Sequence, residues 1–347
     1  MSNPLRGLVL VSVLVGGCQV APVEPIRWRP LLTGSQASLR GLSAVDEQVA
    51  YVSGSGGTLL RTMDGGESWD SVAPPGTSRC DFRDVEALDR DQVVAMVAGQ
   101  PARVYRSEDA GATWRLVHED PREAAFFDAL AFAGDVGVMF GDAIDGQFCM
   151  LQSHDGGRSW RDRSGELLPP PGDGEAAFAA SGTCLVAIDA DRGVFSLVTG
   201  GGQSRAITFG SSVSDVSGRR YWSRGLPLQS GSSSQGAFSV AWDGARGVAV
   251  GGDYRAPEAA QASVAITTDG GATWAAGDAG GFRSAVIWLS SRALLAVGSH
   301  GASWSKDGGR TWIAFGQQGF HCLSRGGDGS VWAAGSDGRV ARLMMAR

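Results

Sequence analysis

The stretch Thr62-Met63-Asp64-Gly65-Gly66-Glu67-Ser68-Trp69 is the most informative part of this chain. It fits the template (S/T)-x-D-x-G-x-(S/T)-W, which we call an Asp-box. Four further copies occupy residues 107–114, 153–160, 267–274 and 305–312. A pattern this specific is not expected to occur five times by chance. Recurrence of one motif along a chain indicates a fold built from structural repeats.

The residue types of the Asp-box indicate a tight hairpin turn. An Asp carboxylate accepts backbone N–H groups in such a turn, and Gly supplies the positive φ that other residues resist. The hydroxyl ties the turn to the next strand, and Trp packs between neighbouring sheets. We therefore assign a structural role, not a catalytic or metal-binding one, to Asp64, Trp69, Asp109, Trp114, Asp155, Trp160, Asp269, Trp274, Asp307 and Trp312.

Residues 199–205 resemble a sixth, decayed copy of the Asp-box. Gly200 stands in place of the Asp and Arg205 in place of the Trp. Gly200 follows Asp155 by the same 45-residue step that separates Asp109 from Asp64. This regular spacing predicts that the segment is the Asp-box turn of a fourth repeat.

A second pattern counts the repeats independently. An apolar residue followed by a variable one opens the predicted inner strand of each repeat, at Leu39-Arg40, Phe82-Arg83, Phe127-Asp128, Phe178-Ala179, Phe238-Ser239, Phe282-Arg283 and Phe320-His321. The last repeat lacks an outer strand, and residues 26–32 can supply it. We therefore predict an all-β, seven-bladed β-propeller over residues 26–347, with four-stranded antiparallel blades and a ring closed by the N-terminal strand.

The first residues differ from the rest of the chain. Arg6 precedes a short apolar run, and Val15-Gly16-Gly17-Cys18 resembles a bacterial lipobox. We expect residues 1–18 to be a lipoprotein signal peptide, with Cys18 acylated as the first mature residue, and residues 19–25 to be a tether. Gln19 gives no inner-membrane retention signal, so we expect an outer-membrane protein facing the periplasm in a Gram-negative cell. An ordinary signal peptide with an unrelated cysteine is the alternative.

Composition narrows the classes of function. The chain has 347 residues with Gly 52 and only 19% charged residues, which suits many short strands joined by tight turns. A net charge of −6 disfavours nucleic acid as a partner. An exported protein can form disulfides, but the spacing shows neither a pairing nor a zinc motif, and buried free thiols are equally compatible, for Cys80, Cys149, Cys184 and Cys322.

With these repeats, the chain resembles the Asp-box propellers of the photosystem II stability/assembly factor family, and in particular bacterial members labelled "oxidoreductase". Sialidase-like propellers are more distantly similar. The resemblance covers roughly residues 28–343, and its other characteristic stretches are 141–146, 174–183, 251–254, 281–285 and 338–343. It implies an assembly or scaffold role. The oxidoreductase label has no support, because the sequence has no dinucleotide, haem or flavin motif, and we predict no cofactor or metal.

The long, irregular loops are expected on one face of the ring, opposite the Asp-boxes, and function collects on such loops. The variable inner-strand positions point to the same place. The candidate mouth is therefore Arg40, Arg83, Asp128, Asp142, Glu175, Ser239, Tyr254, Arg283 and His321. Three arginines around one funnel suit a carboxylate or phosphate. Alternatively, they merely pair with Asp84, Asp128 and Glu175. His321 is either a lining residue or a general base.

Two functions from different classes remain open. The first is a non-enzymatic binding, scaffold or assembly factor of the cell envelope, a monomer attached to the membrane only through its lipid. Its partner would be an envelope protein, or an anionic small molecule or glycan. The second is a sialidase-like or other glycoside hydrolase, but the Arg-Ile-Pro stretch usual in sialidases is missing. No spacing singles out a catalytic pair among Asp128, Asp142 and Glu175.

Overall fold

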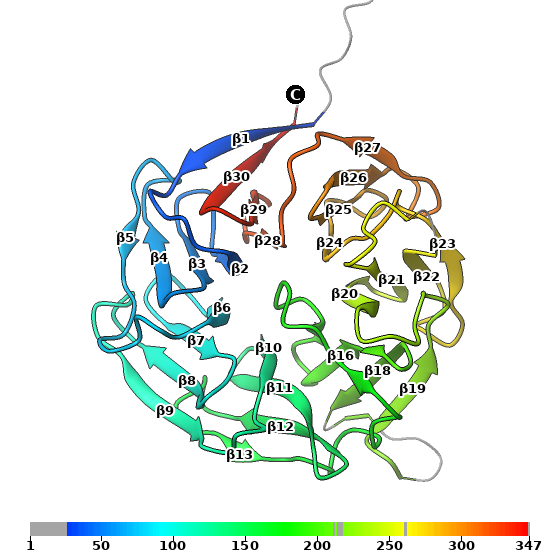
Figure 1. Ribbon diagram of the computed structural model, residues 1–347, viewed down its shortest axis with the longest axis horizontal. Helices are drawn as coiled ribbons and strands as arrows, with labels where there is room; N and C mark the ends of the chain where they lie inside the picture. The colour runs from blue at the N-terminus through cyan, green and yellow to red at the C-terminus, as the bar shows by residue number, and fades with distance from the viewer. Residues whose placement is uncertain (1–25, 211, 214–217, 260–261, 346–347) are drawn as a thin grey trace, which may run out of the picture.

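Short strands joined by glycine-rich turns form seven sheets around a ring (Figure 1). The computed structural model describes residues 26–345 except for 211, 214–217 and 260–261. The predicted seven-bladed β-propeller is confirmed. The predicted signal peptide, lipobox, Cys18 and tether lie outside the described residues, and the described residues contain no helix long and apolar enough to cross a membrane.

Each blade has four antiparallel strands, taken here from the inner to the outer strand. Blades one to three comprise β2 (Leu39–Ala44), β3 (Ala50–Gly54), β4 (Thr58–Thr62), β5 (Asp70–Ser71); β6 (Phe82–Ala87), β7 (Val93–Val97), β8 (Ala102–Ser107), β9 (Arg115–Asp120); and β10 (Phe127–Ala133), β11 (Val136–Ile144), β12 (Gln147–Ser153), β13 (Arg161–Asp162). Blades four and five comprise β15 (Leu185–Asp189), β16 (Val194–Val198), β18 (Arg205–Gly210), β19 (Tyr221–Gly225); and β20 (Gln235–Asp243), β21 (Arg246–Asp253), β22 (Val264–Thr267), β23 (Ala275–Gly277). Blades six and seven comprise β24 (Ala285–Trp288), β25 (Leu294–Gly298), β26 (Gly301–Ser305), β27 (Ile313–Phe315); and β28 (Cys322–Arg325), β29 (Val331–Ala334), β30 (Arg339–Met344), β1 (Arg27–Leu32).

The ring closes as the sequence predicts. The N-terminal strand β1 pairs with β30 from Arg27 opposite Met344 to Leu32 opposite Arg339, so the last blade is built from both ends of the described chain (Figure 1). Trp28 adds ring contacts with Phe320. Closure satisfies a row of backbone groups that would otherwise form an open sheet edge.

The second strands of the blades are the centre of the core. All residues of β3, β7 and β25 are buried, and they form short apolar runs bounded by turns. Such runs are typical of strands covered on both faces. Here each blade packs against its neighbours; between blades seven and one, for example, the buried cluster includes Leu39, Val52 and Trp332.

The five Asp-box turns share one set of hydrogen bonds. In the turn at Asp155, the carboxylate accepts the Ser159 amide at 2.9 Å, the Ser159 hydroxyl at 2.6 Å and the Ser153 hydroxyl at 2.8 Å. Equivalent bonds surround the other four aspartates, Asp64, Asp109, Asp269 and Asp307. Each carboxylate thus holds the turn between the third and fourth strands of its blade.

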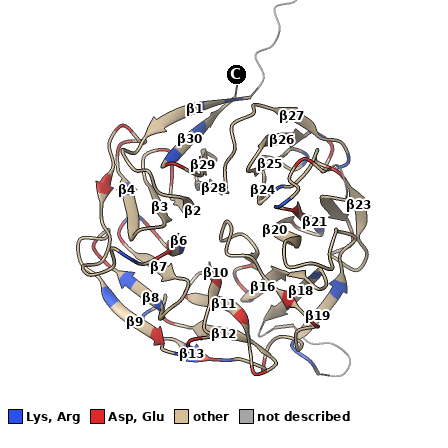
Figure 2. Ribbon diagram, viewed as in Figure 1, with Lys and Arg blue, Asp and Glu red and all other residues tan. Residues whose placement is uncertain are grey.

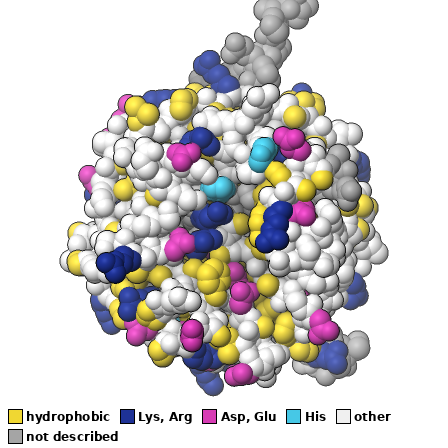
Figure 3. Space-filling view, viewed as in Figure 1, with side chains coloured by type: hydrophobic (Ala, Val, Ile, Leu, Met, Phe, Trp, Pro, Cys, Tyr) yellow, Lys and Arg dark blue, Asp and Glu magenta, His cyan; other side chains and the backbone are white. Residues whose placement is uncertain are grey.

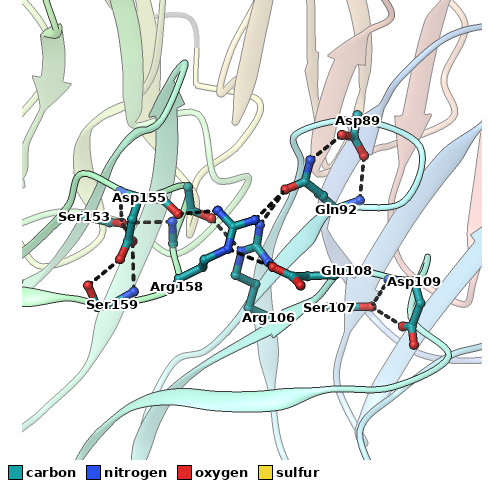
Figure 4. Close-up of polar contacts among 12 residues, drawn as sticks. Asp89, Gln92, Arg106, Ser107, Glu108, Asp109, Ser153, Asp155, Arg158 and Ser159 are labelled. Atoms are coloured by element: carbon teal, nitrogen blue, oxygen red, sulfur yellow. Dashed lines mark hydrogen bonds and ion pairs between the residues drawn. The ribbon is translucent and has the colours of Figure 1, made fainter.

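Between blades two and three, arginines link these turns to each other (Figure 4). Arg106 is 3% exposed and donates to the Gly156 carbonyl at 2.7 Å and to Gln92 at 2.6 Å. Glu108 accepts from both Arg106 and Arg158. The regular turns therefore also stabilise the contact between neighbouring blades.

Blade four corrects two sequence-based predictions. Its inner strand β15 begins at Leu185, so Phe178 and Ala179 do not open it; they lie in the long loop 163–184. The segment 199–205 joins β16 to β18, the second and third strands, so it is not a decayed Asp-box turn. The long loop places the strands of blade four later in the sequence. A 45-residue step from Asp155 therefore reaches the turn between its second and third strands instead of the turn between its third and fourth.

The long loop of blade four crosses to the centre of the ring, where Figure 1 shows it in green. We call residues 163–184 the insert. Within it, the short strand β14 (Glu175–Ala176) pairs with β17 (Gly200–Gly201), and β17 pairs with β20 of blade five. The insert is thus attached to the inner edge of the next blade.

Candidate functional site

A cavity of about 420 Å³ opens where the inner strands converge. This volume lies within the usual range for ligand sites. Figure 3 shows basic and histidine side chains beside hydrophobic ones near the centre of this face. The cavity, which we call the mouth, is lined by Arg40, Arg83, Phe178, Ala179, Ala180, Phe238, Tyr254, Phe282, Ser284, Ser299 and His321.

One wall of the mouth is cationic. Arg83 donates to Asp81 at 2.6 Å and to the Ala179 carbonyl at 2.9 Å. Arg40 has no hydrogen bond or ion pair with any residue of the described ranges. Burial, followed by the neighbouring Arg83, lowers the pKa of Arg40, but an arginine remains charged at any physiological pH. The wall therefore carries one uncompensated positive charge.

His321 lines the same cavity as the two arginines but is neutral. Its Nε2 lies 3.0 Å from the Ser336 hydroxyl. Burial, with Arg40, Arg339 and Arg83, lowers the pKa of His321 to about 4. A general base works best with a pKa near the working pH. The arrangement therefore favours the lining role for His321 over the general-base role.

The opposite wall is aromatic. Phe178 of the insert stacks on Phe238 with ring centroids 3.7 Å apart and planes 3° apart. Phe282 and Tyr254 meet Phe238 edge-on, at 4.8 Å and 6.2 Å. Tyr254 is 42% exposed and Phe178 is half-buried, whereas Phe238 and Phe282 are buried. The wall thus presents two rings that rest on two buried ones.

Of the residues predicted for the mouth, Arg40, Arg83, Tyr254 and His321 line it, and five do not. Arg283 is 4% exposed, and its guanidinium donates to the carbonyls of Phe282 and Ala279 and to Ser303. Ser239 is fully buried and accepts from Thr183 and the Val286 amide. These two side chains belong to the interior of blades five and six.

The other three predicted residues are carboxyls outside the mouth. Asp128 is 1% exposed and Asp142 is partly buried, and each keeps one buried oxygen that has no partner within the described residues. Burial, together with Asp142, raises the pKa of Asp128 well above its usual value. Burial raises the pKa of Asp142 to about 6. Figure 2 shows acidic segments on the inner strands β6 and β10.

Glu175 fixes the insert at its short strand β14. Its side chain is fully buried and accepts from Arg205 at 2.6 and 2.8 Å, Thr199 at 2.5 Å, Gln203 at 2.7 Å and the Gly172 amide at 2.8 Å. Burial alone would raise the pKa of Glu175, but these donors outweigh it and the pKa is lowered. The carboxylate is therefore charged and fully paired.

The alternative, a pairing of the arginines with Asp84, Asp128 and Glu175, does not occur as ion pairs among the described residues. Arg83 pairs with Asp81, and Glu175 pairs with Arg205. Sequence reasoning missed Arg205 because it was assigned to a decayed Asp-box. It missed the aromatic wall because the Phe residues were interpreted only as markers of strand starts.

No group of three or more His, Cys, Asp or Glu suited to hold a metal occurs in the described part of the chain. The cysteines Cys80, Cys149, Cys184 and Cys322 are all free thiols.

Comparisons with known proteins agree with this architecture. The family model described as photosynthesis system II assembly factor YCF48 matches residues 22–125. A photosystem II assembly lipoprotein Ycf48 from Synechococcus sp. (strain CC9902) is 26% identical over 167 residues. This match covers 44% of the present chain and 46% of that relative, so it spans less than half of either protein.

Solved structures share the fold. A YCF48 bound to a D1 peptide superposes with a TM-score of 0.60 at 14% identity, over 92% of this chain and 95% of that one. YCF48 from Cyanidioschyzon merolae gives 0.58 at 17% identity, over 91% and 98%. The GH74 xyloglucanase from Xanthomonas campestris gives 0.63 at 15% identity, over 91% and 53%. Taken with the sequence matches, these findings show that the chain is a β-propeller similar to the photosystem II assembly factor Ycf48.

Proposed function

We propose that this chain is a non-enzymatic binding and assembly factor of the cell envelope that docks an anionic segment of a partner protein in the mouth. The observation that carries the proposal is Arg40, a partly buried cation without a partner among the described residues. A desolvated, uncompensated charge costs free energy unless a ligand supplies the opposite charge. A guanidinium suits a carboxylate, which it binds through two parallel hydrogen bonds.

The comparisons support a protein as the partner. The relative from Synechococcus is named an assembly lipoprotein, and a structural neighbour is described as bound to a D1 peptide. The stretch 15–18, which resembles a lipobox, agrees with export as a lipoprotein. We carry over the kind of partner, a protein segment, and not its identity, because fold similarity by itself does not transfer a ligand.

A glycoside hydrolase has less support. The xyloglucanase neighbour shares the fold, but a hydrolase needs two carboxyls flanking the substrate. Among the nominated residues, Asp128 is buried away from the mouth and Glu175 is held by Arg205. Neither carboxyl is available to a sugar in the mouth. Release of sugars from glycans by the purified protein, lost in Asp142→Asn, would instead favour this alternative.

The test compares crosslinked partners of three forms of the tagged full chain in the envelope fraction. They are the unchanged protein, Arg40→Gln, and Arg115→Gln as a matched control on the exposed outer strand β9. Arg283 is left unchanged because its guanidinium stabilises blade six. We expect the unchanged protein and the control to capture a partner through crosslinks around the mouth, and Arg40→Gln to lose it.

The captured segment is then synthesised and titrated against the same three proteins. Direct binding that needs Arg40 and a carboxylate of the segment supports the proposal. Capture that is equal for all three forms, or a segment whose binding is indifferent to its carboxylates, overturns it.

A further inference from the structure

The mouth joins two unlike walls in one cavity. Arg40 and Arg83 face it from blades one and two, while Phe178, Phe238, Tyr254 and Phe282 face it from the insert and from blades five and six. An anion by itself would need only the arginines. The aromatic wall therefore indicates that the ligand also carries an apolar group.

Within the aromatic wall, Phe178 is an addition specific to blade four. Phe178 reaches the mouth because the insert leaves the ring wall and crosses to the axis, where the Ala179 carbonyl accepts from Arg83. Ser181 and Thr183 bind the Ser284 carbonyl and Ser239, in blades six and five. The loop that brings the ring into the cavity is thus attached at several points around it.

Two further features hold Phe178 over Phe238. The buried ion pair of Glu175 with Arg205 fixes the insert just before Phe178. Gly200 makes room for the ring, because a Cβ at this position would lie 2.3 Å from Cε2 of Phe178. A glycine that replaces the expected Asp is therefore explained by this close approach and not by decay of a motif.

We propose that the mouth recognises a carboxylate and a large apolar side chain together, in neighbouring positions of one peptide segment. The arginines bind the carboxylate, and the aromatic wall covers the apolar side chain. Glu175 and Arg205 are positioning residues, since they act only through the insert. The inference rests on the proposed function and adds to it the chemistry of the partner segment.

The carboxylate has two sources, a chain end or an Asp or Glu side chain. The probes separate the source from the apolar requirement. N-acetyl-phenylalanine carries a terminal carboxylate beside an aromatic ring, N-acetyl-glycine lacks the ring, and N-acetyl-phenylalanine amide lacks the charge. The dipeptide N-acetyl-aspartyl-phenylalanine amide offers a side-chain carboxylate instead. Ligand-observed NMR gives the Kd of each probe for the full chain.

We expect the probes with both elements to bind about tenfold or more tightly than those with one, since burying an aromatic side chain is worth roughly 1.5–3 kcal/mol. Phe178→Ala should remove the advantage of phenylalanine over glycine, whereas Arg40→Gln should remove the advantage of the acid over the amide. Leu116→Ala, at an exposed position on β9, is the control and should change neither. Phe178 is half-buried, so its variant should remain folded, which a thermal melt verifies.

The positioning role has its own readout. Arg205→Lys retains the charge and should keep part of the phenylalanine advantage, whereas Arg205→Gln should lose it while the acid-over-amide advantage persists. A general loss of structure would reduce both advantages together.

Each outcome decides the inference. If N-acetyl-glycine binds as tightly as N-acetyl-phenylalanine and Phe178→Ala has no effect, the apolar element is wrong, while the anion-binding function stands. If no probe binds, the inference is overturned, and the partner-capture experiment then shows whether the proposed function fails with it.

Discussion

On the face that carries the Asp-boxes, five turns repeat one set of hydrogen bonds, whereas the loops of the mouth face differ in length and in what they bind. The Asp155 carboxylate accepts hydrogen bonds from residues within four positions of itself. The Glu175 carboxylate instead binds Arg205 and Thr199, 30 and 24 positions away. The first arrangement builds the ring, and the second places one loop across it.

For these two carboxylates, the partners indicate the role. Hydrogen bonds within the turn occur in each of the five blades that carry an Asp-box, and they stabilise the fold. The Glu175–Arg205 pair occurs where blade four departs from the others, and that departure brings Phe178 into the mouth. We expect substitutions on the two faces to separate stability from binding.

The largest expected effect is at Glu175. Glu175→Gln leaves the partly buried Arg205 without its counter-charge and should lower the free energy of unfolding by about 3–5 kcal/mol. Glu67→Gln is the matched control, since its pair with Arg29 has side chains 67% and 46% exposed and should contribute less than about 1 kcal/mol. Urea unfolding measures both. Equal losses would show that the insert's ion pair is no more important than a surface pair.

A smaller loss is expected at a regular turn. Asp155→Ala removes the acceptor of three hydrogen bonds and should cost roughly 1–3 kcal/mol. Asp191→Ala, exposed in the turn after β15, should change stability by less than about 0.5 kcal/mol. The phenylalanine advantage of the mouth should survive Asp155→Ala, and its loss would contradict the separation of the two faces.

The same variant has a defined pH dependence. Burial would raise the pKa of Asp155, but bonds from Ser159 and Ser153 outweigh it and lower the pKa to about 2. Because the folded-state pKa is depressed, the stabilisation is present above the unfolded value of about 4 and is lost as pH falls through about 2. Melts at pH 7 and pH 2.5 should therefore show a smaller difference between Asp155→Ala and the unchanged protein at the lower pH.

A stabilising substitution is expected at Asp142, outside the mouth. Burial raises the pKa of Asp142 to about 6 in the folded protein, compared with about 4 in the unfolded chain. The contribution of this carboxyl to the free energy of unfolding is therefore most favourable below about pH 4 and is lost as pH rises through about 6. Asp142→Asn should raise the free energy of unfolding by about 1 kcal/mol at pH 8 and leave it unchanged at pH 4. Asp145→Asn, in the exposed turn after β11, is the control. A loss of stability at pH 8 would contradict the prediction.

The smallest effect is a shift in the pKa of His321. Burial is the main cause of its low value and Arg40 is the next. Arg40→Gln should therefore raise the His321 pKa above about 4 while leaving it below the ordinary value near 6.5. NMR titration of the imidazole ring measures it, with Arg115→Gln as the control. An unchanged pKa would mean that the charge of Arg40 has no effect on His321.

The N-terminal closure and the blade count could be predicted because both depend on pattern. Residues 26–32 were predicted to supply the outer strand that the last repeat lacks, and β1 pairs with β30 accordingly. Arg40 and Arg83 also follow from position, since each is the second residue of an inner strand that begins at the mouth. Arg283 was predicted to have the same place, but its inner strand β24 begins only at Ala285, and the Arg283 side chain turns into the interior, towards Ser303. Position along a strand therefore predicts the neighbourhood of a side chain better than its direction.

The sequence by itself determined the repeats, the seven blades and the cationic inner positions, because an Asp-box is closed by bonds between residues at most four positions apart. Only the tertiary structure decided the path of the insert, the pairing of Glu175 with Arg205 and the stacking of Phe178 on Phe238. These contacts join residues that are distant along the chain, and nothing in a local pattern specifies which of many polar and aromatic residues meet. The physical reason is that the path of a long loop depends on the distant residues that pair with its buried charges and pack against its aromatic rings.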